Sequence, residues 1–357
     1  MPKLSIKPLN LLLLFVPIAL IAESSAGDPA LIFGLAALAV IPLAGLIGEA
    51  TEELAARTGP KVGGLLNATL GNAAELIITI FALREGLLEL VRASITGSIL
   101  GNLLLVMGLS IFVGGLKNGI QQFDRRNAGL NATLVILALV ALMVPSIFDA
   151  AIQDNLTSEI GLSEGVAVVM IVIYGLSVWY SFTQGRRGEP VTREPAVHEA
   201  KWSARVALIV LAAATVGIVL MSEVLVGAVE HVTETLGLTE FFIGIIIIPL
   251  VGNVAEHLVA VQVAYKNKME LSLAVSLGSS LQVALFVAPV LVFISLLLGG
   301  ETLLLVFNSF ELVALAAASA VAAFIALDGE SNWLEGAMLL GVYIIIAIAF
   351  YYLPAVA

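Results

Sequence analysis

Gly71-Asn72-Ala73-Ala74-Glu75 in the first half of the chain returns as Gly252-Asn253-Val254-Ala255-Glu256 in the second half. Aligned from these two glycines without gaps, 38 pairs of residues contain 12 identities. Apolar composition alone would match leucines and alanines. It does not readily match this pentapeptide followed, at equal spacing, by Gly97-Ser98 and Gly278-Ser279. The chain therefore contains an internal repeat.

Apolar segments near the length of a membrane-spanning helix recur along the 357 residues. Hydrophobic residues make up 60% of the chain and charged residues 12%, whereas soluble domains carry about 25% charged residues. A surface that faces lipid explains this composition, and we expect no nucleic-acid partner. The sequence predicts an all-α polytopic membrane protein in a lipid bilayer, with eleven transmembrane helices. Their expected ranges are 9–25, 30–55, 62–84, 90–115, 128–148, 162–183, 204–228, 238–264, 270–298, 307–327 and 333–353.

Basic residues favour the cytoplasmic side of short membrane loops. If the eleven segments alternate from an inner N-terminus, 14 of the 16 Lys and Arg residues fall inside, and Arg84 and Arg92 are the exceptions. We therefore predict a cytoplasmic N-terminus and a C-terminus outside. The inner residues are Lys3, Lys7, Arg57, Lys61, Lys117, Arg125, Arg126, Arg186, Arg187, Arg193, Lys201, Arg205, Lys266 and Lys268.

The two copies of the motif are separated by an odd number of predicted spans, so the helix with Glu75 runs opposite to the helix with Glu256. Inverted repeats of this kind place the substrate site of secondary transporters near the middle of the bilayer. We expect an N-terminal transmembrane helix at 1–27, a first five-helix repeat at 28–184, a cytoplasmic linker at 185–203 and a second five-helix repeat at 204–357. A cleavable signal peptide is the alternative interpretation of the first apolar run.

Each motif glutamate lies well inside an apolar segment, where a charge costs about 2.5–3.5 kcal/mol even on a lenient insertion scale. Two such acids at repeat-related positions, each three residues after an asparagine, favour a functional role for Glu75 and Glu256 over a structural one. Glycine and asparagine weaken the helix locally, and Pro249 removes a helix hydrogen bond before the second motif. Freed carbonyl oxygens beside a carboxylate suit Ca²⁺.

The following segments add polar groups at matching or neighbouring positions. Ser98 corresponds to Ser279, Asn102 corresponds to Val283, and Gln282 corresponds to Gly101. The site is therefore expected to be pseudo-symmetric. The chain has no cysteine and only three histidines, which argues against a soft or zinc-type site.

Other acids are expected to be solvated, as acids at helix ends usually are, including Glu52 and Glu53. Glu49 and Glu223 occupy similar places in the two halves and are candidate gate or ion-access residues. His257 adjoins Glu256 and is a candidate for tuning its protonation, with a plain structural role as the alternative.

The two motifs, with His257 after the second, resemble the signature repeats of the calcium/proton exchanger (cation exchanger) family, within the calcium/cation antiporter superfamily. The runs 61–71 and 278–289 are similar to that family as well, and the eleven-helix plan extends the resemblance over nearly the whole chain. The vacuolar members usually carry an acidic segment in the central linker. Because the linker here has mixed charge, the resemblance points to a prokaryotic member in the cell membrane.

The resemblance implies that Glu75 and Glu256 are the central cation ligands. It also implies that the remaining ligands are the asparagines, nearby main-chain carbonyls and the polar residues of the following helices. These further candidates are Asn72, Asn253, Gly71, Gly252, Ser98, Ser279, Gln282 and Asn102.

Two carboxylates in a site without water rarely stay ionised together, because each repels the other and loses hydration. Ca²⁺ needs both of them charged, and release of Ca²⁺ favours their protonation. The sequence therefore predicts a secondary active antiporter that exports Ca²⁺ in exchange for H⁺ by alternating access, and that is not an enzyme and has no cofactor. A Na⁺/Ca²⁺ exchanger of the same superfamily and a passive cation channel are the alternatives. An intramembrane hydrolase would need a motif such as H-E-x-x-H, which is missing from the sequence.

Overall fold

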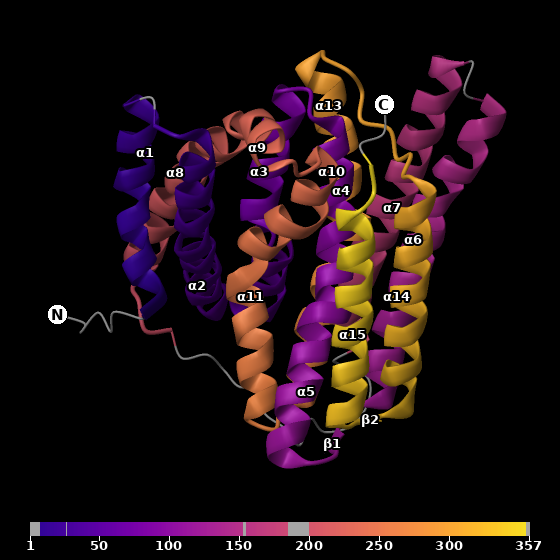
Figure 1. Ribbon diagram of the computed structural model, residues 1–357. Helices are drawn as coiled ribbons and strands as arrows, with labels where there is room; N and C mark the ends of the chain where they lie inside the picture. The colour runs from indigo at the N-terminus through magenta and orange to yellow at the C-terminus, as the bar shows by residue number, and fades with distance from the viewer. Residues whose placement is uncertain (1–7, 26, 153–154, 185–199, 355–357) are drawn as a thin grey trace. The chain divides into compact units, whose positions relative to one another are not determined.

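The computed structural model describes residues 8–25, 27–152, 155–184 and 200–354, and most of these are helical (Figure 1). Lys3, Lys7 and linker residues 185–199, with Arg186, Arg187, Arg193 and His198, lie outside the described residues. The elements are η1 Pro8–Leu14, α1 Phe15–Ser24, α2 Pro29–Leu70, α3 Ala73–Arg84, α4 Leu88–Leu100, η2 Gly101–Val106, α5 Met107–Asn118, β1 Gln121–Gln122, α6 Arg125–Ile152, α7 Leu156–Gln184, α8 Ala204–Gly227, α9 Val229–Leu236, α10 Glu240–Phe242, η3 Ile243–Ile247, α11 Ile248–Tyr265, α12 Met269–Gln282, η4 Val283–Val287, α13 Ala288–Leu298, α14 Ser309–Asp328, β2 Glu330–Ser331 and α15 Trp333–Tyr351.

Long apolar helices dominate the fold. Nine helices of the described residues are long and apolar enough to cross a membrane, and each coincides with a predicted span. The chain is therefore an all-α, multi-pass membrane protein. The other two predicted spans, 9–25 and 62–84, correspond to the shorter apolar helix Pro8–Ser24 and to the end of α2 with the 12-residue α3.

Helix α2 has helical backbone over 42 residues, Pro29–Leu70, but it does not run straight. A Cβ built at Gly63 would lie 2.6 Å from the carbonyl oxygen of Ala55, whereas eight residues of straight helix would separate them by about 12 Å. The chain therefore folds back between Ala55 and Gly63, where the sequence predicted the end of one span and the start of the next. The helical conformation persists through this bend, and the next interruption falls at Gly71.

The helices gather into two compact units. The first comprises Met1–Phe81, Val172–Leu236 and Val251–Ala255. Within it α2 packs against α1 and α8. The α2–α8 packing is close, because a Cβ built at Gly217 would lie 2.7 Å from the Leu43 side chain.

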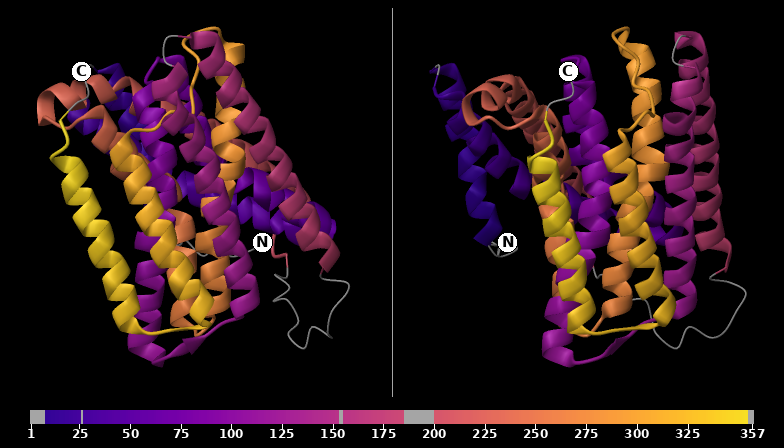
Figure 2. Two further views of the ribbon diagram at one scale, coloured as in Figure 1. Left: turned by 90° about the vertical axis from the view of Figure 1, so that its right-hand side faces the viewer. Right: turned by 45° about the vertical axis from the view of Figure 1, so that its right-hand side comes forward.

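The second unit comprises Ala82–Ile171, Gly237–Leu250 and Glu256–Ala357. Within it α14 packs against α6, α15 against α5, and α4 against η3, and both views of Figure 2 show α14 and α15 as long neighbouring rods. The strands β1 and β2 pair antiparallel, Gln121 opposite Ser331. Both units draw on both halves of the sequence, so they divide the chain differently from the predicted domains.

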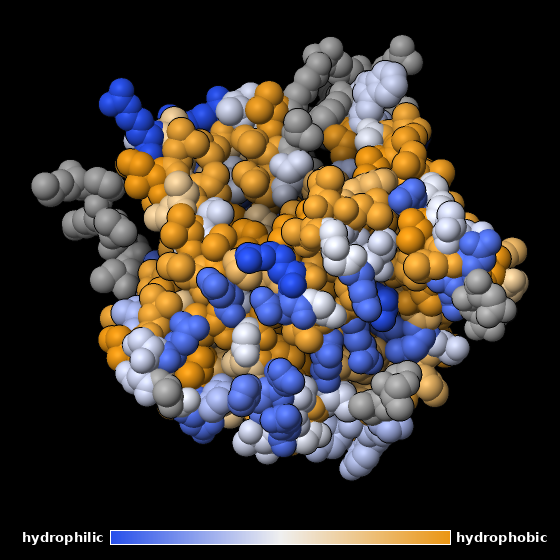
Figure 3. Space-filling model, turned by 90° about the horizontal axis from the view of Figure 1, so that it is seen from above, coloured by the Kyte–Doolittle hydropathy of each residue, from blue (hydrophilic) through white to orange (hydrophobic). Residues whose placement is uncertain are grey.

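The outer faces of these helices are strongly apolar. Leu297, Phe324 and Ile209 are 85%, 76% and 67% exposed, and they are three of many large apolar side chains in contact with solvent. Figure 3 shows apolar residues over much of one face, with hydrophilic residues gathered over part of it. Exposed apolar area on this scale is rare in soluble monomers and is expected where lipid surrounds the helices.

Candidate functional site

The first motif lies where the helix is interrupted. Helix α2 ends at Leu70, Gly71 and Asn72 form a turn, and α3 begins at Ala73, which confirms the predicted opening. Glu75 lies in the first turn of α3, where the unpaired N–H groups of a helix start favour a carboxylate. Glu75 and Asn72 are buried, at 1% and 4% exposure.

The second motif lies within a continuous helix. Helix α11 runs through Gly252 and Asn253 without a break, so the prediction of an opening at Gly252 is wrong. The irregularity lies upstream, in the π-helical segment η3, Ile243–Ile247. Pro249 follows directly after this segment, inside a helix that runs from Glu240 to Tyr265, so its missing N–H removes a helix hydrogen bond next to the irregularity.

The start of the second motif lies beside the first motif within the first unit. A Cβ built on Gly252 would lie 4.0 Å from the Cβ of Glu75, and the neighbouring Asn253 is buried at 3% exposure. Glu256 follows Gly252 by four residues and so lies on the same face of α11, one turn on. Glu256 is half-buried, and its Oε2 atom, like that of Glu75, is shielded from solvent.

Predicted site residues of the second unit also meet. The Asn102 amide Nδ2 donates a hydrogen bond of 3.0 Å to the Ser279 hydroxyl, joining η2 of the first half to α12 of the second half. Ser98, Asn102 and Ser279 are 1%, 2% and 5% exposed, and Gln282 is half-buried. Residues that the sequence analysis selected from separate halves are therefore in direct contact.

The candidate gate residues have different surroundings. Glu49 is half-buried on α2, Glu223 is exposed on α8, and His257 is buried in α11 at 9% exposure. Their helices and burial do not place the three residues in one group, and they do not indicate a role for any of them.

The expectation that Glu53 is solvated is wrong. Glu53 is 1% exposed, because the chain that follows the linker covers it. The Trp202 backbone N–H donates to Glu53 Oε2 at 2.9 Å, and the Arg57 guanidinium donates to the Trp202 carbonyl. One turn of α2 thus holds both main-chain polar groups of Trp202, while Glu52 remains exposed as expected.

A buried acid that the sequence analysis missed lies on α14. The Glu311 side chain is 3% exposed. Its Oε1 accepts a 2.7 Å hydrogen bond from the Thr96 hydroxyl on α4, and its Oε2 accepts one of 2.9 Å from the Asn308 backbone N–H. Arg92 and Glu89 lie within electrostatic range of Glu311. The sequence signal was Asn308-x-x-Glu311 before an apolar run, a capping box.

Arg92 was an exception to the predicted distribution of basic residues. Its electrostatic proximity to Glu311 and Glu89 gives a local reason for a cation at this position. A basic residue close to one buried and one half-buried acid has a local role that the loop-charge rule does not include.

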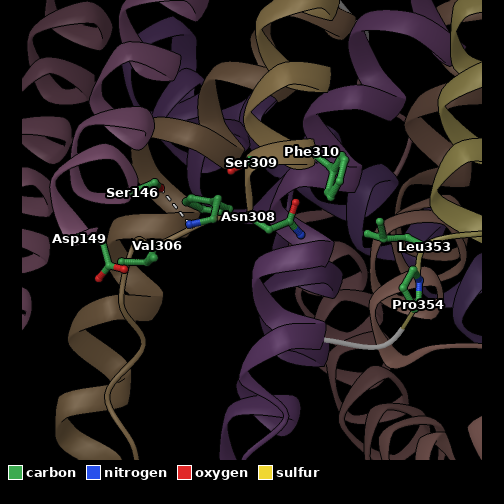
Figure 4. Close-up of a pocket in the computed structure, with 9 residues that line it drawn as sticks. Ser146, Asp149, Val306, Asn308, Ser309, Phe310, Leu353 and Pro354 are labelled. Atoms are coloured by element: carbon green, nitrogen blue, oxygen red, sulfur yellow. Dashed lines mark hydrogen bonds between the residues drawn. The ribbon is translucent and has the colours of Figure 1, made fainter. Parts of the chain in front are cut away.

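A pocket of about 460 Å³ opens beside the start of α14 (Figure 4). Ser146, Asp149, Asn308 and Phe310 are among its lining residues. The dashed line in Figure 4 is the 2.9 Å bond from the Phe307 backbone N–H to Ser146 Oγ. None of the predicted ion ligands lines this pocket, so its volume does not mark the ion site.

The donor atoms gathered around the motifs are oxygens. Within the part of the chain that the structure describes, no three His, Cys, Asp or Glu side chains come together as a metal-binding group. A cation bound among the described residues would therefore need amide, hydroxyl and main-chain oxygens in addition to one or two carboxylates. Ca²⁺ accepts six to eight such ligands in flexible geometry.

Known proteins similar to this chain identify its family. The sequence profile of the family described as "Sodium/calcium exchanger protein" matches residues 29–183 and 206–352. The chain belongs to this family. Over its whole length it is similar to proteins named as Ca²⁺/H⁺ antiporters, so the predicted resemblance to calcium/proton exchangers is confirmed.

Two relatives and one solved structure carry that conclusion. The Ca²⁺/H⁺ antiporter of Aphanothece halophytica is 44% identical over 97% of this chain and 96% of its own. The Ca²⁺/H⁺ antiporter ChaA of Bacillus subtilis is 44% identical over 95% of this chain and 97% of its own. The structure of native YfkE superposes with a TM-score of 0.85 at 42% identity, covering 97% of this chain and all of that one.

Proposed function

We propose that this protein is a Ca²⁺/H⁺ antiporter in which Glu75 and Glu256 bind either one Ca²⁺ or protons. It is a transporter and not an enzyme, with Ca²⁺ and H⁺ as its transported substrates. The observation that carries the residue assignment is the adjacency of Gly252 to Glu75. That contact brings the second motif to the first, and the four-residue spacing then turns Glu256 to the same face of α11.

The chemistry follows from the carboxylates. The two glutamates bind Ca²⁺ when both are ionised, and two protons neutralise them when Ca²⁺ leaves. The remaining ligands are Asn72 and Asn253, main-chain carbonyls near Gly71 and Gly252, and Ser98, Ser279, Asn102 and Gln282. Exchange for two protons moves no net charge, whereas outward movement of Ca²⁺ alone against 100 mV costs about 4.6 kcal/mol.

We further propose eleven spans, arranged as one N-terminal helix and two inverted five-helix repeats. Two observations support the repeat. The family profile matches each half of the chain once. The π-helical segment Gly101–Val106 and the π-helical segment Val283–Val287 end at residues paired in the sequence alignment. Alternating access about the shared site is the expected motion of such a fold.

The proposed location is the cell membrane, with the N-terminus in the cytoplasm, the C-terminus outside and Ca²⁺ moving outward. The distribution of basic residues supports the orientation. The chain contains no cysteine, so single cysteines can report sidedness without background. We expect an impermeant maleimide added to intact cells to label Glu301→Cys and not Lys266→Cys, and the reverse pattern would contradict the orientation.

Transport in sealed vesicles with an acidic interior tests the function. We expect external ⁴⁵Ca²⁺ uptake that a protonophore abolishes and that Glu75→Gln and Glu256→Gln each reduce at least ~100-fold, since each removes a ligand charge needed for the ion. The apparent KM for Ca²⁺ should rise as external pH falls, because protons compete for the same oxygens. Glu301→Gln, which removes an exposed loop charge, is the matched control and should transport normally.

Two outcomes would redirect the assignment. Uptake driven by a sodium gradient at equal pH would favour Na⁺/Ca²⁺ exchange. Uptake that follows the Ca²⁺ gradient alone, without counter-transport, would favour a passive channel. Normal transport by both glutamine variants would contradict the role of the motif glutamates.

A further inference from the structure

The carboxylate of Glu311 links α14 to the helix that carries Ser98 and Asn102. Its two oxygens each accept one hydrogen bond, from the Thr96 hydroxyl on α4 at 2.7 Å and from the Asn308 backbone N–H at 2.9 Å. Both donors present hydrogens, so the carboxylate needs no proton of its own to complete these bonds. Because Glu311 is only 3% exposed, its hydrogen bond with Thr96 is protected from competition with water.

A second capping box in the same unit shows what this linkage adds. Helix α15 begins with Asn332 and Glu335, arranged as Asn308 and Glu311 are at the start of α14. Glu335 Oε2 accepts a 3.1 Å hydrogen bond from the Asn332 backbone N–H. Within the described part of the chain, Glu335 has no side-chain bond to another helix, whereas Glu311 has one. Helix capping therefore does not account for the Thr96 contact.

The Thr96 contact lies close to the proposed ligands along the same helix. Thr96 precedes Ser98 by two residues, and Asn102, whose amide reaches Ser279 on α12, follows within two turns. Helix α14 packs against both α4 and η2. Movement of α4 along its axis would break the Thr96 bond and would also carry Asn102 away from Ser279.

We propose that Glu311 is a positioning residue for ion binding: by accepting the Thr96 hydroxyl it fixes α4 on α14, so that Ser98 and Asn102 are held at the ion site. This inference rests on the proposed Ca²⁺/H⁺ exchange. Glu311 does not itself bind the ion, and it acts through Thr96. At the position matched to Thr96, the second half of the chain has Leu277, so the linkage belongs to the first half alone.

The deciding variant is Thr96→Val, which removes the hydroxyl, keeps the shape of the side chain and leaves the Glu311 capping box intact. In the proton-driven vesicle assay we expect the KM for Ca²⁺ to rise about fivefold to tenfold, as for the loss of one hydrogen bond of ordinary net strength. Vmax should stay within about twofold, because the carboxylates and the motion are unchanged. Thr96→Ser, which retains the hydroxyl, should restore the wild-type KM.

Glu311→Ala and Glu335→Ala form a matched pair, since each removes one capping box but only the first removes the α4 bond. We expect Glu311→Ala to raise the KM for Ca²⁺ and Glu335→Ala to leave it unchanged. Adding Thr96→Val to Glu311→Ala should raise the KM no further. A wild-type KM for Thr96→Val overturns the inference, as does an equal effect of Glu335→Ala. In both cases the wild-type protein still exchanges Ca²⁺ for protons; a wild-type protein without exchange overturns the proposed function and this inference with it.

Discussion

Segments Leu88–Val106 and Met269–Val287 each form an α-helix that passes into a π-helical segment, yet they are held by different contacts. The first segment is bound by other elements: Glu240 Oε1 accepts the Leu90 backbone N–H at 2.9 Å, and Thr96 donates to Glu311. In the second segment, Ser276 and Ser280 donate to the carbonyls of Ser272 and Ser276 in their own helix.

Gly97 and Gly278, which are paired in the repeat, also differ in how closely other elements approach them. A Cβ on Gly97 would overlap the Ile245 carbonyl of η3 and lie 2.7 Å from Pro249 Cγ. A Cβ on Gly278 would meet no atom within 4 Å among the described residues. The repeated backbone thus carries two different sets of contacts: of these two walls of the proposed ion site, one is closely packed at Gly97 and the other has space beside Gly278.

The largest expected difference concerns these glycines. Gly97→Ala forces a methyl group against a backbone carbonyl and should cost about 1–3 kcal/mol, as overpacked cores do, with transport falling in parallel. Gly278→Ala meets no obstacle and should be neutral or stabilising by up to ~1 kcal/mol, through helix propensity. Thermal unfolding in detergent measures both, and equal effects of the two variants would remove the distinction between the walls.

The bond that joins the two segments should show a smaller effect. Asn102→Val, which introduces the residue type found at the matched position 283, leaves the Ser279 hydroxyl without its amide donor. Asn102→Val and Ser279→Ala should each raise the Ca²⁺ KM severalfold. In the double variant the KM should rise by less than the product of the two single increases, with a coupling free energy of ~0.5–1.5 kcal/mol. Additive changes in KM would indicate that the two side chains act separately.

The smallest effect is expected inside the second segment. The Ser276 hydroxyl bonds a carbonyl of its own helix, an interaction that contributes little to helix stability. Ser276→Ala should therefore change the free energy of unfolding by no more than ~0.5 kcal/mol and leave the KM for Ca²⁺ unaltered. A larger loss in denaturant titration would mean that this helix, too, depends on its hydroxyl groups.

Much of the fold could be predicted because helices that cross a lipid bilayer must be apolar over most of their length. Long apolar runs separated by charged residues predicted the nine long helices found among the described residues. The recurring pentapeptide identified segments that the structure brings together at Gly252 and Glu75. The charge around Arg57 predicted a turn between 55 and 62, and the chain does fold back there, with Gly63 against Ala55. Only the backbone geometry shows that the helical conformation persists through this bend to Leu70.

The environment of individual polar residues was less predictable. Glu53 and Glu311 are both buried by segments far away in the sequence, the chain near Trp202 and the threonine on α4. Their burial depends on tertiary packing, which the local pattern does not contain. Asn102 and Ser279 were selected from separate halves of the chain and are in contact, but the hydrogen bond between their side chains could not be derived from their spacing.

The π-helical segment η2 determines which side chains of one long helix face each neighbouring helix. A π turn holds an additional residue, so it acts as a one-residue insertion and shifts all later side chains by about 100° around the helix axis. Before the insertion, Gly97 faces η3; after it, Gly108 faces Leu339 and Leu340 of α15. Deleting one residue from η2 would keep a continuous hydrophobic helix of almost the same length, yet would set its two ends against the wrong partners.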